Sequence, residues 1–220
     1  MKAISIEELI TIFESSDFEE DPSISIVRHS IDDRDLRFDI KLTDDYDPLK
    51  QQDWEIVCKD VVGFQIHANA HTTSGQFFHK KQHPLLWEFL EPQVDLYFTG
   101  NCASSQELIG ALYQKHLKLT DGWIPFAQFF NMANDPIQLF RGSAGKLAGG
   151  PKCLLNGYSQ VLAAAGLVTS FSKERRPVHW DETHQWVEQR SDLSIVGIGS
   201  SYFVAREFKA HRLEESGREN

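Results

Sequence analysis

The sequence predicts an α+β protein built around an antiparallel sheet, and three observations lead to this prediction. Apolar and charged residues alternate in several segments, most clearly in 36–42, which is typical of a half-buried strand. Strands with one buried and one wet face favour antiparallel pairing, since parallel strands read as continuous apolar runs. Capping signals that precede periodic apolar residues indicate helices. No repeat or low-complexity linker divides the chain, so we expect one globular domain over residues 1–210 and a frayed polar tail over 211–220.

The strands are expected to form a meander within residues 23–99, joined by a C-terminal strand pair within 193–208, whose strands are expected at 193–198 and 202–208. The expected strands of the meander lie at 23–27, 36–42, 54–58, 64–68 and 94–98. Three to four helices are expected to pack mainly on one side of this sheet, at 5–15, 103–119 and 152–166, with a short one after Pro84. A β-sandwich with inserted helices is the alternative. The glycine-rich stretch 141–150 lacks the spacing of a phosphate-binding P-loop and is interpreted as a flexible loop.

Two capping boxes define the helix starts. Ser5 is followed three residues later by Glu8, and Ser104 by Glu107, which is the pattern in which a hydroxyl and a carboxylate satisfy free backbone N–H groups. Apolar residues follow each box at helical spacing. Pro151 occupies the first position of the third expected helix, where its missing N–H costs nothing.

The formal charge of the chain is concentrated near its N-terminus. The 220 residues carry a net charge of −10, and residues 1–60 hold 17 Asp and Glu against 7 Lys and Arg. Residues 61–220 hold 15 of each sign. Such an acidic surface repels phosphate backbones and attracts a basic protein partner, so we expect no nucleic-acid partner. A solvated surface that serves only solubility is the other interpretation.

The expected cellular compartment follows from features that the sequence lacks. No apolar run approaches the ~18 residues that span a bilayer, so no membrane is expected. The N-terminal residues are acidic after Lys2 and do not resemble a secretory signal. The three widely spaced cysteines form neither a disulfide framework nor a zinc motif. A cytoplasmic location is therefore expected.

Histidine pairs are the strongest chemical pattern. Two His-x3-His pairs fall within seventeen positions, and their members are His67, His71, His79 and His83. On a helix, imidazoles four residues apart share a face and can chelate zinc or another transition metal. On a strand the same spacing places them ~13 Å apart, too far for one ion. These four residues are the predicted metal ligands, and loop histidines without a metal are the alternative.

Acidic and aromatic clusters supply candidate interaction residues. Two aspartate groups flank the strand 36–42, but the strand holds them ~23 Å apart, and neither has the spacing of a calcium-binding loop. An aromatic segment, 123–130, suits either a core or an interface. The predicted interaction residues are Asp32, Asp33, Asp35, Asp44, Asp45, Asp47, Trp123 and Phe126.

No sequence motif specifies a reaction. Cys153 is the one candidate catalytic nucleophile, because a helix N-terminus and Lys152 would lower its thiol pKa. No Ser-His-Asp order, dinucleotide fingerprint or kinase motif is present, although triads are spatial and need no fixed order. We expect a non-enzymatic binding or protein-interaction protein, with a metal-binding protein or metal-dependent hydrolase that uses the histidines as the alternative.

Overall fold

The computed structural model divides the chain into two compact units. Unit 1 comprises residues 1–82 and 192–220, and unit 2 comprises residues 83–191. The structure describes residues 3–14, 23–44, 51–67, 72, 76–131, 136–180, 186–188 and 191–213. The predicted single domain over 1–210 stays a prediction, and the predicted tail lies outside the described residues from 214 onward.

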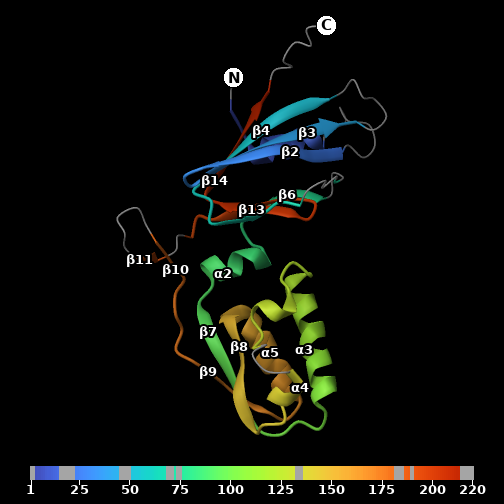
Figure 1. Ribbon diagram of the computed structural model, residues 1–220, viewed down its shortest axis with the longest axis vertical. Coiled ribbons are helices and arrows are strands. Elements are labelled where there is room, and N and C mark those ends of the chain that lie inside the picture. Colours follow the sequence, from blue (N-terminus) through green and yellow to red (C-terminus); the bar gives the residue numbers. More distant parts are fainter. Residues whose placement is uncertain are drawn as a thin grey trace. The chain divides into compact units, whose positions relative to one another are not determined.

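Unit 1 contains two antiparallel sheets. The first has the strand order β1 (Ile4–Ser5), β14 (Glu207–Arg212), β4 (Gln52–Lys59), β3 (Asp35–Thr43) and β2 (Ser23–Asp32). The second has the order β5 (Gly63–Gln65), β13 (Ser201–Ala205), β12 (Ser194–Ile198) and β6 (Phe77–Lys80). Figure 1 shows β2, β3 and β4 in one layer and β6 and β13 in another. The meander β2-β3-β4 has the predicted neighbours.

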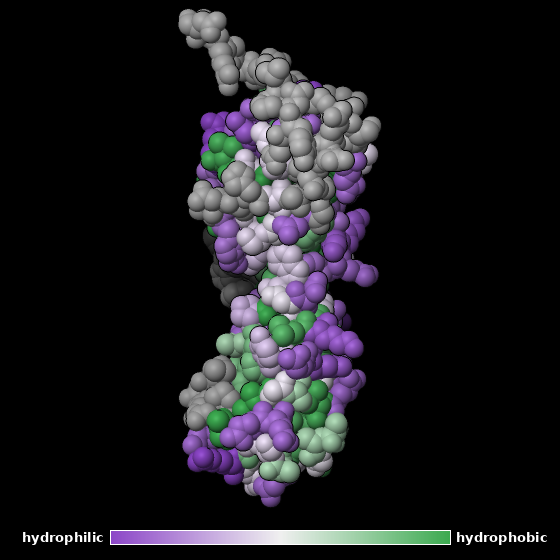
Figure 2. All heavy atoms as spheres, turned by 90° about the vertical axis from the view of Figure 1, so that its right-hand side faces the viewer, coloured by the Kyte–Doolittle hydropathy of each residue, from purple (hydrophilic) through white to green (hydrophobic). Residues whose placement is uncertain are grey.

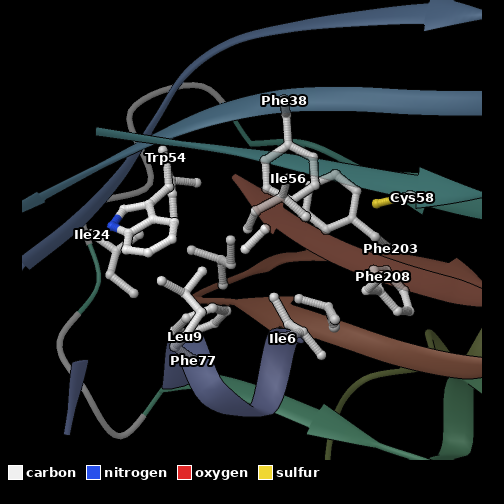
Figure 3. Packing of buried hydrophobic residues seen from close by; sticks show 14 of the residues in the cluster. Ile6, Leu9, Ile24, Phe38, Trp54, Ile56, Cys58, Phe77, Phe203 and Phe208 are labelled. Carbon is white, nitrogen blue, oxygen red and sulfur yellow. The ribbon is translucent and has the colours of Figure 1, made fainter. Parts of the chain in front are cut away.

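One hydrophobic core joins the two sheets of unit 1. Phe38 of β3 stacks on Phe203 of β13 with ring centroids 4.1 Å apart, and Figure 3 shows the two rings side by side. Helix α1 (Ile6–Phe13) directs Ile6 and Leu9 into the same core (Figure 3). The predicted capping box is present, since Ser5 accepts from the Glu8 N–H and Glu8 accepts from the Ser5 N–H.

Strands β13 and β14 are consecutive but belong to different sheets. The chain changes sheet at Arg206, whose N–H donates to the Lys59 carbonyl. Its guanidinium pairs with Asp60 and Asp192. The predicted continuous strand 202–208 is therefore interrupted, because two facing sheets can share a chain only through a bend of this kind.

Unit 2 has a three-stranded antiparallel sheet in the order β8 (Ala144–Pro151), β7 (Gln93–Thr99) and β9 (Val168–Phe171). Helices α3 (Ser105–Thr120) and α5 (Lys152–Ala164) pack against each other, and α5 packs on the sheet. Short elements complete the unit: η2 (Pro84–Leu86), α2 (Trp87–Leu90), η3 (Phe126–Gln128), α4 (Pro136–Leu139), β10 (Val178–Trp180) and β11 (Trp186–Glu188). Figure 1 shows α3 and α5 beside the sheet.

Three further features differ from the sequence-based prediction. The protein is mixed α and β with antiparallel sheets, but the described residues hold five α-helices, not three to four. The expected strand 64–68 is the shorter β5, which pairs with β13 in the second sheet, and the strand at 93–99 pairs within unit 2, so neither extends the meander. The glycine-rich stretch is strand β8, not a flexible loop. Its glycines let neighbouring groups approach closely, since a Cβ on Gly150 would lie 2.6 Å from the Phe129 ring.

Candidate functional site

Strand β2 forms an open edge of the first sheet in unit 1. It pairs with β3 on one side, and among the described residues its other side carries one bridge, between Ile24 and Thr72. From Val27 to Asp32 every residue is exposed, and the apolar Val27 and Ile31 are 62% and 58% exposed. Long edge strands with exposed apolar side chains are templates for pairing with another chain.

The backbone pattern shows which groups of β2 point away from β3. Ile24 exchanges both of its backbone hydrogen bonds with Thr72, so its N–H and C=O face outward. In an antiparallel pair, bonded and open positions alternate. The extra residue Val27 forms a bulge, and past it the alternation makes Arg28 a bonded position and His29 and Ile31 open ones.

The hairpin turn at the C-terminal end of β2 identifies the same outward-facing positions. Asp32 pairs with Asp35 across a two-residue turn, where the first and last residues share a hydrogen bond. Counting back from Asp32 again makes Ile31 and His29 open positions. No described strand pairs with this side of β2, so the main-chain N–H and C=O groups of these two residues face outward, where a further strand would pair.

Two of the acidic residues near this edge form ion pairs with basic side chains. Asp39 pairs with Arg28, and Asp35 pairs with Lys59. Hydrogen bonding to Lys59 lowers the pKa of Asp35, even though burial opposes this shift. Asp32 and Asp33 are exposed at the hairpin turn. These two are the predicted interaction residues that the structure places on the surface beside β2.

The other predicted acidic residues lie elsewhere. Asp44 is buried, with 1% of its surface exposed, so it adds nothing to an acidic face. Asp45 and Asp47 lie outside the described residues. Three exposed acidic residues that were not predicted as interaction residues lie in α1 and at its C-terminal end: Glu7 and Glu8 in the helix, and Glu14 at its C-cap. The helical spacing of Glu7 and Glu14 could have revealed them, since residues seven apart share a helix face.

The predicted histidine ligands make protein contacts. The His67 Nε2 lies 2.8 Å from the Gln65 side-chain nitrogen. The His83 Nδ1 accepts from the Leu85 N–H at 3.3 Å and caps η2 in unit 2. His79 lies on β6 in unit 1, and His71 lies outside the described residues. Within the described ranges, no three His, Cys, Asp or Glu side chains form a group that could hold a metal. Zinc binding by the four histidines stays a prediction.

His79 belongs to a three-residue polar cluster in unit 1. Its Nδ1 lies 2.8 Å from Glu7 Oε1, and its Nε2 lies 2.8 Å from Ser194 Oγ. The Phe208 ring packs edge-on against the imidazole, with centroids 5.7 Å apart. The His79 side chain is 11% exposed and the Glu7 side chain 61%, and Ser194 exposes 4% of its surface. The three residues come from α1, β6 and β12.

The protonation of this cluster follows from Glu7. Burial acts to raise the Glu7 pKa, but a backbone hydrogen bond at the start of α1 and the nearby His79 lower it overall. An ionised carboxylate only accepts hydrogen bonds, so the His79 Nδ1 carries the proton that it donates to Glu7. In the neutral imidazole Nε2 is then an acceptor, and the Ser194 hydroxyl donates to it.

Cys153 has an environment that opposes the thiolate form. It lies in the first turn of α5, where the sequence suggested a lowered pKa. Burial and the nearby Glu91 instead raise its pKa to about 11, although backbone hydrogen bonds act in the opposite direction. Lys152 pairs with Glu174. The role of Cys153 as a nucleophile stays a prediction, and its surroundings in unit 2 do not favour it.

The aromatic candidates pack within unit 2. Trp123 lies edge-on to His83 at 5.0 Å. Phe126 contacts the rings of Tyr113, His116 and Phe130 at 4.8 to 5.6 Å and belongs to the margin of the core. In Figure 2 hydrophobic residues are mixed with hydrophilic ones on the visible face of this unit. These contacts favour the core interpretation over an interface.

Comparisons with known protein families, curated proteins and solved structures find no match to this chain. Among the helices that the structure describes, none has the length and apolar character needed to cross a membrane. The choice between candidate sites therefore rests on their geometry.

Proposed function

We propose that unit 1 is a binding module that takes up an extended segment of a basic protein partner along strand β2. The observation that carries this proposal is the run of six exposed residues on an open edge strand, Val27–Asp32. In strand addition, main-chain hydrogen bonds supply affinity and alternate side chains supply specificity. His29 and Ile31 offer the main-chain groups, and the exposed Ile31 side chain offers apolar area.

Charge supports a basic partner. Unit 1 holds 22 Asp and Glu against 13 Lys and Arg, a net charge of −9, whereas unit 2 holds 10 against 9, a net charge of −1. A second copy of the chain would bring two units of net charge −9 together, and their repulsion disfavours that pairing. A basic segment is attracted instead, and Asp32 and Asp33 stand beside the edge to meet it.

The test uses the full chain and a fluorescent peptide in which lysine and valine alternate. We expect binding that weakens steeply with added salt, measured by fluorescence anisotropy. The variant Ile31→Pro removes the outward N–H without removing a bond to β3, because edge strands tolerate proline at such positions. We expect it to weaken binding by about tenfold or more, since a backbone hydrogen bond and apolar contact are lost.

Control variants separate the contribution of strand pairing at β2 from that of the acidic side chains. Ile31→Ala keeps the N–H and should bind more tightly than Ile31→Pro. The double variant Asp32→Asn with Asp33→Asn should reduce the salt dependence, while a peptide with glutamate in place of lysine should not bind. Binding of the lysine peptide that neither Ile31→Pro nor salt reduces would contradict the proposal.

A further inference from the structure

We propose that Ser194 is a catalytic nucleophile, with His79 as its general base and Glu7 as the residue that positions the imidazole. This inference goes beyond the binding function of β2 and rests on different residues. The three side chains are distant in sequence and meet in the fold, with the two contacts of the imidazole both 2.8 Å long.

The order of contacts matches the chemical requirement. A serine nucleophile needs a base that accepts its proton, and the base needs a third group that fixes its tautomer. The carboxylate contacts Nδ1 and the hydroxyl contacts Nε2, which is the same arrangement as in serine hydrolases with a Ser-His-acid triad. The tautomer that Glu7 imposes leaves Nε2 free to accept the Ser194 proton.

A second buried histidine shows what distinguishes this cluster. His116 in unit 2 is fully buried, and its nitrogens contact the Tyr158 hydroxyl and the Ile124 carbonyl. Neither partner is a carboxylate, and a carbonyl cannot take part in proton transfer. Among the histidines described, His79 has both a carboxylate and a serine hydroxyl on its ring.

The reaction that these groups support is hydrolysis of a small carboxylic ester. Ser194 Oγ attacks the carbonyl carbon while its proton passes to His79 Nε2. The bond to the alcohol oxygen breaks, and His79 returns that proton to the departing alkoxide. Water, deprotonated by His79, then attacks the acyl group on Ser194, which releases the carboxylic acid and restores the hydroxyl.

Burial limits the substrate. Ser194 exposes 4% of its surface, and the His79 side chain 11%, so a small acyl group suits the site better than a protein or polysaccharide. Of the elements packed against His79, α1 contributes the carboxylate of Glu7, β12 the Ser194 hydroxyl and β14 the apolar Phe208 ring. Glu7 is thus the charged group among these contacts.

The first experiment needs no variant. The full chain is treated with phenylmethylsulfonyl fluoride, which transfers its sulfonyl group to an activated serine with loss of fluoride, and the adduct is located by peptide mass spectrometry. We expect one adduct, on Ser194. If the wild-type chain forms no adduct on Ser194, the proposal is overturned and the cluster serves only to hold α1 to the sheet.

Variants then assign the roles. Ser194→Ala should lose both the adduct and hydrolysis of p-nitrophenyl acetate. Ser201→Ala is the matched control, because Ser201 is also buried, on neighbouring β13, but its hydroxyl accepts from the His67 backbone N–H. It should retain both. His79→Gln should slow labelling by about 100-fold or more, the lower range of general-base contributions; equal labelling rates in His79→Gln and wild type would refute the assignment.

The positioning role of Glu7 has its own readout. Glu7→Gln should slow the labelling of Ser194, because the imidazole loses the carboxylate that fixes its orientation, and Glu7→Asp, which keeps a carboxylate, should recover part of the rate. Glu8→Gln, one residue along α1, keeps the capping box and should label at the wild-type rate. A Glu7→Gln variant that labels at the wild-type rate would remove Glu7 from the mechanism. Intact labelling in Ile31→Pro would confirm that the two sites are independent.

Discussion

At the scale of single residues, the hydrogen-bond partners of the ring nitrogens distinguish a structural histidine from a candidate catalytic one. The His116 Nε2 lies 2.6 Å from the Ile124 carbonyl and its Nδ1 lies 2.7 Å from the Tyr158 hydroxyl. Because a carbonyl only accepts, the His116 Nε2 carries a proton that it donates to Ile124. Both ring nitrogens are therefore paired, which fits a structural role in the core of unit 2. His79 differs because one partner is ionised.

Cys153 gives a residue-scale prediction about pH. Its thiol pKa is raised to about 11 by burial and by Glu91, so the thiolate is scarce at neutral pH and grows about tenfold with each pH unit up to that value. We expect iodoacetamide to label Cys153 slowly at neutral pH, with a rate that rises steeply in alkaline buffer. Peptide mass spectrometry over a pH series measures this rate.

A Cys153→Ser variant identifies the signal that belongs to this thiol. Rapid labelling at neutral pH, with a rate that stays flat as pH rises, would contradict the raised pKa. It would also restore Cys153 as a candidate nucleophile.

At the scale of elements, a glycine decides how β12 pairs with β6. Gly197 is the partner of Phe78 in the ladder, and a Cβ on Gly197 would lie 2.3 Å from the Phe78 ring. The ring thus occupies the space that a side chain at position 197 would need. Since an aromatic ring cannot compress, a larger residue must displace the ring or the strand.

We therefore expect Gly197→Ala to lower the free energy of unfolding by about 1–3 kcal/mol, the usual cost of overpacking. Urea unfolding measures this change. In a Phe78→Ala background the same substitution should cost less than about 0.5 kcal/mol, because the obstructing ring is gone. Equal costs in the two backgrounds would show that the strain does not come from Phe78.

The helices show which elements local sequence predicts. The boxes at Ser5 and Ser104 predicted the starts of α1 and α3, and both serine side chains accept a hydrogen bond three residues along. These starts depend on residues within one turn, so local sequence is sufficient. Strand β8 was missed because glycine-rich sequence has no apolar alternation, and its strand conformation depends on pairing with β7.

At the scale of the whole molecule, the two units have separate cores. Among the described residues, the buried cluster that contains Phe38 and Phe203 consists of residues of unit 1, and the cluster that contains Leu96 and Tyr158 consists of residues of unit 2. Unit 2 is continuous in sequence, whereas unit 1 is formed by segments on both sides of it. A continuous segment with its own core can fold alone.

We therefore expect residues 83–191, expressed as a separate chain, to unfold cooperatively in urea and to protect the amides of α3 and α5 from hydrogen exchange. Circular dichroism and exchange mass spectrometry provide the measurements. A fragment that lacks cooperative unfolding, beside a full chain that unfolds in one transition, would favour the single domain that the sequence predicts.

The sequence by itself determined the mixed α and β class, the antiparallel pairing, the meander around β3 and the capped helices, because each depends on periodicity or on contacts within a few residues. Tertiary structure alone decided the rest. Glu7, His79 and Ser194 are brought together only by strand pairing and by the packing of α1, so no local sequence pattern predicts this cluster. The open edge of β2 likewise exists only because no described strand pairs beyond it, which depends on the order of strands in the sheet and not on their sequences.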